Sequence, residues 1–523
     1  MRETLRLKLS QFFISFKQND HSQELTRFWL LRGIGFLYFC AFFPLIFQFK
    51  PLLGSDGLLP LSHFLQKTQS YLGDLNPFWN LPNIFWLNDS DSFGIFLIFL
   101  GTLLSLIVMM GFANFFILLS LWIIQLSIYH VGQTFWGFGW EMNLLELGFL
   151  ALFLVPVFNL SPFSQKLPPP QIILFFFRLV LFKVMLGSGL IKIRGDACWS
   201  SLECLSYHFE TQPIPGPLSA FFHHLPKFIL KGGVIFNHMV ELILPWFIFF
   251  KGRPRLMTGF IFILFQLTLI LSGNYGWINY LTLVMIIPCL DDSFFKKVTP
   301  NFILEKMRLK KELDEKKNRY QLIQVAVSIV LLYLSINPIK NLIGPRQVMN
   351  ASYDQFALVN TYGLFGGITK KRFEIVIKGT KDKKISTQTK WIEYSIPCKP
   401  GIPSKKPCIA SPYHYRLAWQ IWFAAIDKNR IQPWLVHLVY KILFHKKEAL
   451  SLFEDNPFPR IPPNYVKMDL YLYEFYNPKK HGDEGINKKL WYKRKFIKSY
   501  LPPLHKHHPK LKNFINKKGW PLN

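Results

Sequence analysis

The chain has 523 residues, enough for two or three domains, and a formal net charge of +30. Half of the residues are hydrophobic and 53 are Phe, which indicates long apolar segments joined by basic ones. No zinc-finger, homeodomain or RNP motif accompanies the charge, so we expect no nucleic-acid partner. The first 30 residues hold no apolar core followed by small residues. We therefore expect no cleavable signal peptide, and the first span directs insertion.

Nine apolar runs are long enough, or nearly long enough, to cross a bilayer. They are 33–49, 92–110, 113–129, 144–158, 172–190, 233–250, 256–271, 277–290 and 322–336. The eighth, with 14 residues, either spans the membrane or re-enters it, so the count lies between seven and nine. The predicted fold is a polytopic α-helical membrane protein of about nine transmembrane helices, with a segment at 1–32 before the 33–336 bundle.

The placement of Lys and Arg orients this bundle. Six precede the first span, three lie in the turn at 251–255 and nine lie in 291–320, whereas 130–143 has none. With nine spans, the basic segments and the N-terminus face the cytosol. The loops at 52–60, 132–141 and 187–217, and everything after residue 336, then face the other side.

Residues 337–523 are predicted to form a soluble extracytoplasmic α+β domain. They carry 34 Lys and Arg against 12 Asp and Glu. Strands are expected at 372–379, 391–397 and 465–475, and helices at 416–426 and 433–444. Trp419, Trp422 and Phe423 share one helical face, which forms either a core or a docking surface for the bundle. The basic surface suits anionic lipid headgroups or an acidic partner, or is merely solvated.

Ionisable side chains inside spans are costly and usually point into the bundle. Six lie in or beside the fourth, fifth and sixth spans: Glu141, Glu146, Arg178, Lys183, His238 and Glu241. Lys183 and Glu241 share a depth of roughly 12 Å below the outer boundary. We predict that Lys183 or Arg178 pairs with Glu241, in a network that Glu141 and Glu146 can join. Such a network either fixes helix register or lines a cavity open to the outer face.

Four cysteines are predicted to face an oxidising compartment, where disulfides persist. The close pairs Cys198/Cys204 and Cys398/Cys408 suggest two local disulfides. Neither pair has the spacing of a zinc site, so no metal is expected.

Several long motifs resemble the lipase maturation factor family in order and spacing. They include GLIKIRGDACW, ECLSYHFETQPIPGPLS, FGWEMNLLELGFLALFL, NHMVELILPWF and SPYHYRLAWQIWFAA, and the resemblance runs from about residue 52 to the end. The motif residues of the 187–217 segment are Gly195, Asp196, Trp199, Glu210, Gln212 and Pro213. The resemblance implies a multi-pass protein with a luminal domain that assists folding and assembly of secreted dimeric lipases. It implies the endoplasmic reticulum membrane in a eukaryote. The Lys-, Asn-, Ile- and Phe-rich composition instead hints at a microbial genome, for which the bacterial inner membrane is expected.

The bundle also resembles, more remotely, the membrane domain of vitamin K-dependent gamma-carboxylases, through the GLLP loop and the Lys192, Gly195 and Trp199 pattern. That resemblance assigns Lys192 the role of a base on reduced quinone. In an enzyme of this kind, His208, His238, Glu141 or Glu241 would help the lysine. A lysine base needs desolvation or a neighbouring cation. The plainer interpretation is an interfacial lysine that snorkels at a helix end.

Two main functions remain open. The first is a maturation factor without chemistry of its own, which needs no cofactor and has the bilayer and a secreted client, possibly a lipase, as partners. It is favoured because the sequence has no CxxC, GxSxG or HExxH motif. The alternative is a membrane enzyme acting on a lipid, quinone or exported polypeptide, which a cavity joining Lys192, Glu141 and Glu241 would favour. A transporter is a third possibility, although two similar halves are not visible.

Overall fold

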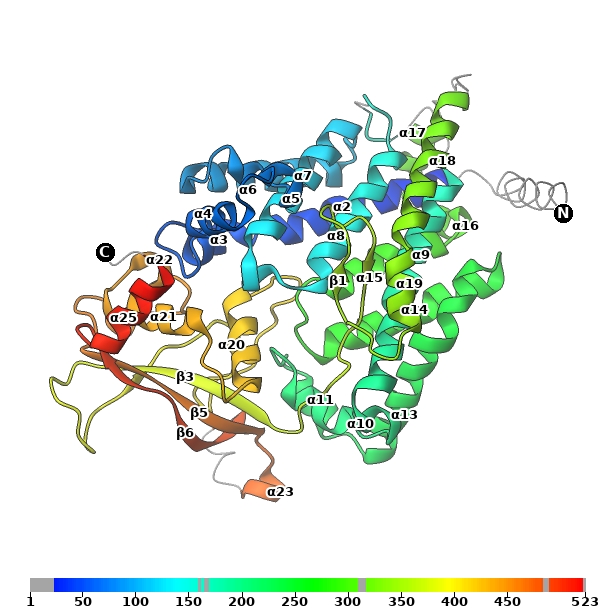
Figure 1. Cartoon of the computed structure of the whole chain (residues 1–523). Coiled ribbons are helices and arrows are strands. Elements are labelled where there is room, and N and C mark those ends of the chain that lie inside the picture. The colour runs from blue at the N-terminus through cyan, green and yellow to red at the C-terminus, as the bar shows by residue number, and fades with distance from the viewer. Residues whose placement is uncertain (1–22, 159–160, 164–168, 309–316, 483–488, 521–523) are drawn as a thin grey trace.

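The computed structural model describes residues 23–158, 161–163, 169–308, 317–482 and 489–520. A helical bundle is followed by a C-terminal part made of a sheet and helices, which covers one end of the bundle (Figure 1). The main bundle helices are α2 (Glu24–Phe42), α6 (Asp91–Met110), α7 (Phe115–Val131), α8 (Gly139–Ala151), α9 (Gln171–Gly195), α13 (Lys227–His238), α14 (Arg253–Ser272), α15 (Ile278–Ile286) and α18 (Lys317–Leu334).

Further helices lie in the connections between them: α3 (Leu45–Leu53), α4 (Leu61–Leu72), α5 (Pro77–Asn80), α10 (Ala197–Ser200), α11 (Leu205–Thr211), α12 (Ser219–His223), α16 (Asp292–Val298), α17 (Asn301–Arg308) and α19 (Ile336–Ile343). After α13 the chain forms a π-helical turn at Met239–Ile243 and a 3₁₀ segment at Leu244–Phe249.

Six helical segments of the described chain are long and apolar enough to cross a membrane. They are Glu24–Phe42, Asp91–Met110, Gln171–Gly195, Lys227–Phe249, Arg253–Ser272 and Leu322–Ile343. A seventh is the pair Ile278–Cys289 and Asp292–Val298, bent by 117°. The polytopic helical fold is thus confirmed, but the count of nine and the topology drawn from it are not. The fourth predicted run gives only the short α8, since Pro156 cannot continue a helix.

The segments that connect the bundle helices lie in two groups, one at each end of the bundle. At one end, Asp292 accepts a hydrogen bond of 2.9 Å from the backbone N–H of Thr26, and Arg255 pairs with Asp291 at 2.5 Å. These contacts join the start of α2, the start of α14 and the basic segment after residue 290. At the other end, His437 of the C-terminal part bonds the Leu58 carbonyl oxygen at 2.7 Å. The start of α2, the start of α14 and the segment after residue 290 therefore lie together, and the loop at 52–60 lies against the C-terminal part.

The C-terminal part is built on an antiparallel four-stranded sheet of order β4-β3-β5-β6. Its strands are β3 (Arg372–Thr380), β4 (Ile392–Glu393), β5 (Tyr465–Phe475) and β6 (Tyr492–His505). Its helices are α20 (Arg416–Ile426), α21 (Pro433–Leu443), α22 (Lys447–Leu450), α23 (Pro478–His481) and α25 (Pro509–Lys518). Helix α20 lies between the sheet and the bundle (Figure 1). A hairpin of β1 (Ala351–Ser352) and β2 (Asn360–Thr361) lies against the bundle helices.

Candidate functional site

Lys192, the candidate base, lies in the last turn of α9 and pairs with Glu241. Its ammonium nitrogen is 2.5 and 2.7 Å from the two carboxylate oxygens and 3.1 Å from Asn237 Oδ1. Asn237 Nδ2 in turn donates to Glu241 Oε2 at 2.9 Å. Both side chains of the ion pair are only 6% exposed. Lys192 is therefore a buried, fully paired cation, and the snorkelling interpretation is wrong.

The predicted partner of Glu241 is also wrong. Helix α9 continues to Gly195, past the expected end of the span, and so keeps Lys192 inside the helix. Glu241 sits in the π-helical turn, whose geometry departs from the α-helical spacing used for the depth estimate. Arg178 instead donates weakly, at 3.5 Å, to the Pro288 carbonyl oxygen.

Lys183 pairs with Glu146 rather than Glu241. The β1–β2 hairpin covers this pair, because Lys183 donates to the Asn360 carbonyl oxygen at 3.3 Å. Tyr362 donates from its hydroxyl to Glu146 at 2.6 Å. The pair thus joins two bundle helices to the segment that leads into the C-terminal part.

Glu141 at the start of α8 pairs with Arg416 at the start of α20, in the C-terminal part. The Arg416 Nη2 to Glu141 Oε1 distance is 2.7 Å, and Arg416 Nη1 donates to the Phe135 carbonyl oxygen at 2.8 Å. Gln125 Nε2 donates to the other Glu141 oxygen at 2.9 Å. The side chains are 2% and 0% exposed. The predicted single network is therefore three separate buried pairs, one of which bridges the two parts of the chain.

The two histidines proposed to assist Lys192 form hydrogen bonds with groups other than its ammonium nitrogen. His208 Nε2 bonds the Tyr275 hydroxyl at 2.8 Å, and His238 Nε2 bonds the Trp199 carbonyl oxygen at 3.1 Å. Burial, with the charge of Lys192 as a second cause, lowers the pKa of His208 to about 3. His208 is consequently a neutral side chain at physiological pH.

The first half of the 187–217 segment docks on residues 365–368. Asp196 caps α10 by accepting from Cys198 N at 3.0 Å, and its other oxygen accepts from Ile368 N at 3.2 Å. Trp199 Nε1 donates to the Phe365 carbonyl oxygen at 3.0 Å. Gly195 must lack a side chain, since a Cβ there would lie 2.5 Å from the Gly366 oxygen. The Cys198–Cys204 disulfide closes the loop that follows.

The second half of the segment is held by Arg372, the first residue of β3. Its guanidinium donates to the carbonyl oxygens of Glu210 at 2.8 Å, Gln212 at 2.5 Å and Pro213 at 3.1 Å. The Glu210 carboxylate accepts from Phe475 N at 2.7 Å, although burial raises its pKa. These motif residues therefore attach the bundle loops to the sheet.

Arg372 belongs to a buried charge cluster that sequence reasoning missed. It pairs with Glu374 at 2.5 Å, and Glu374 also binds Lys399. Burial lowers the pKa of Lys399 to about 8, with Glu374 opposing the shift. The predicted disulfide Cys398–Cys408 is present beside it. Charged residues inside a strand pattern, as in RFEIVIKG, were the available signal for such a cluster.

The disulfide loop also touches the bundle. Asn274, in the connection after α14, donates from Nδ2 to the Cys408 carbonyl oxygen at 2.9 Å. Its Oδ1 accepts from the backbone N–H of Ala410 at 2.7 Å. The loop is thereby fixed between the sheet and the bundle.

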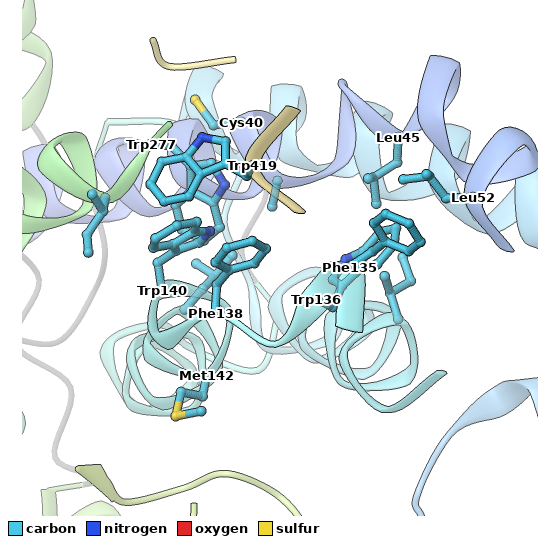
Figure 2. Close-up of a cluster of buried hydrophobic side chains, with 14 of the residues drawn as sticks. Cys40, Leu45, Leu52, Phe135, Trp136, Phe138, Trp140, Met142, Trp277 and Trp419 are labelled. Carbon is cyan, nitrogen blue, oxygen red and sulfur yellow. The ribbon is translucent and has the colours of Figure 1, made fainter. Parts of the chain in front are cut away.

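Aromatic side chains fill the junction between the bundle and α20 (Figure 2). The ring of Trp419 lies 5.7 Å from that of Phe138 and 5.2 Å from that of Trp140, which in turn faces Trp277 at 6.5 Å. The aromatic face predicted on α20 is therefore a docking surface for the bundle. Trp422 contributes differently, since its indole nitrogen donates to the Thr211 carbonyl oxygen at 2.8 Å.

The described residues contain no group of three or more His, Cys, Asp or Glu that could hold a metal ion. Lys192 and Glu241 belong to one buried ion pair, and Glu141 belongs to another with Arg416. The alternative that needs all three side chains around one cavity therefore draws no support from their pairing.

Comparison with known proteins covers both parts of the chain. Residues 25–297 match the lipase maturation factor transmembrane domain, and residues 358–502 match the lipase maturation factor C-terminal domain. Lipase maturation factor 1 of Homo sapiens is 39% identical over 520 residues, covering 95% of this chain and 90% of the relative. The Bos taurus relative of that name is 38% identical, covering 95% and 91%. Lipase maturation factor 2 of Xenopus tropicalis is 27% identical, covering 95% and 85%. No solved structure shows a significant match. The chain therefore belongs to the lipase maturation factor family.

Proposed function

We propose that this chain is a membrane-embedded maturation factor that assists the folding and assembly of secreted proteins. The observation that carries the proposal is a family match that spans both parts of the chain, together with their buried junction. The names of the relatives make a lipase the first client to test. The function requires the bilayer and a client polypeptide as partners, and no cofactor.

The C-terminal part is proposed to face the non-cytosolic compartment. Both disulfides lie at the end of the bundle that this part covers, where an oxidising compartment would preserve them. The basic connecting segments gather at the opposite end, as the positive-inside rule requires of a cytosolic face. In a eukaryotic cell the membrane would be that of the endoplasmic reticulum, and in a bacterium the inner membrane.

The maturation role is tested by rescue. A cell line without its own lipase maturation factors would express a secreted dimeric lipase with this chain or with an empty vector. We expect the chain to raise lipase activity per unit of secreted lipase antigen. Equal specific activity with and without a well-expressed chain would refute a lipase client. A deletion strain of the native host, with unchanged secreted proteins, would refute the maturation role altogether.

Sidedness is tested with a glycosylation tag. Ile385 is 43% exposed on a loop of the C-terminal part and precedes Ser386 and Thr387. In a eukaryotic host, Ile385→Asn creates an acceptor sequon, so a luminal domain would gain an endoglycosidase-sensitive mass. Ile385→Gln is the matched control. An unshifted Ile385→Asn band in a stably expressed protein would place this domain in the cytosol.

A further inference from the structure

A cleft of about 290 Å³ opens where β3, α20 and the end of α11 meet. Its floor includes Thr211 from the bundle loops and Arg372 from the sheet. Since Arg372 holds the 210–213 loop through three carbonyl oxygens, the cleft lies on the seam between the two parts of the chain. A molecule in the cleft would touch both parts at once.

The rim of the cleft is basic. Lys370, Lys371 and Lys428 line it, and all three are exposed. None of them has a carboxylate within ion-pair distance among the residues that the structure describes. Arg372, by contrast, is already satisfied by Glu374 and the loop carbonyls. The rim therefore offers three ammonium groups to an incoming anion.

The walls of the cleft are apolar. Trp422 is half-buried and its ring is fixed by the bond from its indole nitrogen to Thr211. Ile426 is 40% exposed on the next turn of α20, and Phe373 of β3 faces the Lys428 ammonium at 4.5 Å from its ring centre. An apolar wall below a cationic rim is complementary to a ligand with a carboxylate beside an apolar group.

We propose that this cleft binds an acidic residue and an adjoining apolar side chain of the client polypeptide. The inference rests on the proposed maturation function and names the part of the chain that recognises the client. The volume is at the lower limit of about 300 Å³ for small-ligand pockets, which suits one or two side chains. The elements that form it, α11, α20 and β3, lie outside every segment that is long and apolar enough to span a membrane. A polypeptide is therefore favoured over a membrane lipid.

The test measures peptide binding to the purified full-length chain in detergent, by fluorescence anisotropy. The probes are a labelled ten-residue peptide with repeated Glu-Phe pairs and a matched peptide with Gln-Phe pairs. We expect the Glu peptide to bind and the Gln peptide to bind at least about tenfold more weakly. Alanine at all three rim lysines should weaken Glu-peptide binding on the order of tenfold. The matched control replaces three exposed lysines outside the cleft: Lys383, Lys384 and Lys406.

A second pair of variants tests the wall. Ile426→Asp puts a carboxylate into the cleft. Ile431→Asp puts one outside it, on a residue of nearly the same exposure, 41% against 40%. Only Ile426→Asp should abolish binding of the Glu peptide. The proposal would be overturned if the rim and control triple variants lost the same affinity for the Glu peptide, or if the two aspartate variants did. Equal affinity of the wild-type chain for the Glu and Gln peptides would also overturn it.

The lipid alternative has its own outcome. If nanodiscs of phosphatidylglycerol bound through the rim lysines and the Glu peptide did not bind, the ligand of the cleft would be an anionic lipid. That result would overturn the proposal. The binding assay contains no lipase, so it is independent of the rescue assay. If the variant with alanine at all three rim lysines rescued lipase activity to the wild-type level, client recognition by the cleft would be refuted. The maturation function would stand. Peptide binding without any rescue would refute the function instead.

Discussion

The ion pair between Glu141 and Arg416 gives a quantitative prediction about how the two parts of the chain are held together. Glu141→Gln keeps the shape of the side chain but leaves the Arg416 guanidinium as a buried charge without a counterion. Removal of one partner of a buried pair costs roughly 3–5 kcal/mol. Arg416 keeps its bond to the Phe135 carbonyl oxygen and its position 4.0 Å from the Trp136 ring centre. We therefore expect the lower end of that range, about 3 kcal/mol.

Unfolding in urea in detergent micelles would measure this loss. Tryptophan fluorescence is a suitable signal, because Trp140, Trp277 and Trp419 lie at the junction that the pair supports. Addition of Arg416→Met to Glu141→Gln removes both charges. The double variant should lose about 2 kcal/mol less free energy of unfolding than the two single variants lose when their losses are added.

An exposed ion pair in the same chain supplies the control. Lys480 and Glu474 are 63% and 37% exposed at 2.8 Å, and Glu474→Gln should change the free energy of unfolding by no more than about 0.5 kcal/mol. If Glu141→Gln cost no more than this control, or if the double variant simply added the two losses, the buried pair would not link the two parts energetically.

Three further predictions concern Lys192, His208 and the Cys398–Cys408 disulfide. Lys192→Ala should destabilise the chain, because it leaves the buried Glu241 carboxylate without its ion-pair partner. The double variant Lys192→Met with Glu241→Gln should recover both folding and lipase rescue. A folded double variant without rescue would instead assign chemistry to the pair. The folded-state pKa of His208, about 3, lies below its unfolded value of about 6.5, so its stabilisation is complete above pH 6.5 and is lost as pH falls toward 3. Acidification from pH 7 to pH 5 should lower the free energy of unfolding by about 2 kcal/mol through this group. His208→Asn should reduce the pH slope of the free energy of unfolding by about one proton. An unchanged slope would be incompatible with a buried neutral histidine. Serine at Cys398 and Cys408 should cost about 2–4 kcal/mol in urea unfolding, and a smaller loss than 1 kcal/mol would show that the loop is held without the disulfide.

The sequence predicted well those elements whose side-chain pattern matches one periodic structure. Helix α20 and strand β5 have the predicted bounds, 416–426 and 465–475, because the first has a 3.6-residue apolar period and the second alternates. Strand β6 was missed because YKRKFIKSYLPPLH does not alternate and contains two prolines. Its pairing with β5 is interrupted by register shifts, which place residues off the regular period.

The charged pairs were harder to predict than the elements that carry them. Equal depth in the membrane, counted along ideal helices, suggested an ion pair between Lys183 and Glu241. A π-helical turn at Glu241 and an extra helical turn before Gly195 change which groups meet. The partner of Glu141 was beyond any such estimate, because Arg416 lies 275 positions away in another part of the chain. Long-range pairing is decided by tertiary packing, which periodicity within a span does not report.

The location of the motif residues connects these results to function. Asp196 binds residue 368, Glu210 binds residue 475, and the 210–213 carbonyl oxygens bind Arg372, so the segment is an adaptor between bundle and sheet. Each of these contacts is short and directional, and together they fix the sheet against the bundle. A client that bound the cleft at this seam would be held by a surface that neither part forms alone. A maturation factor built in this way would depend on its junction as much as on either domain.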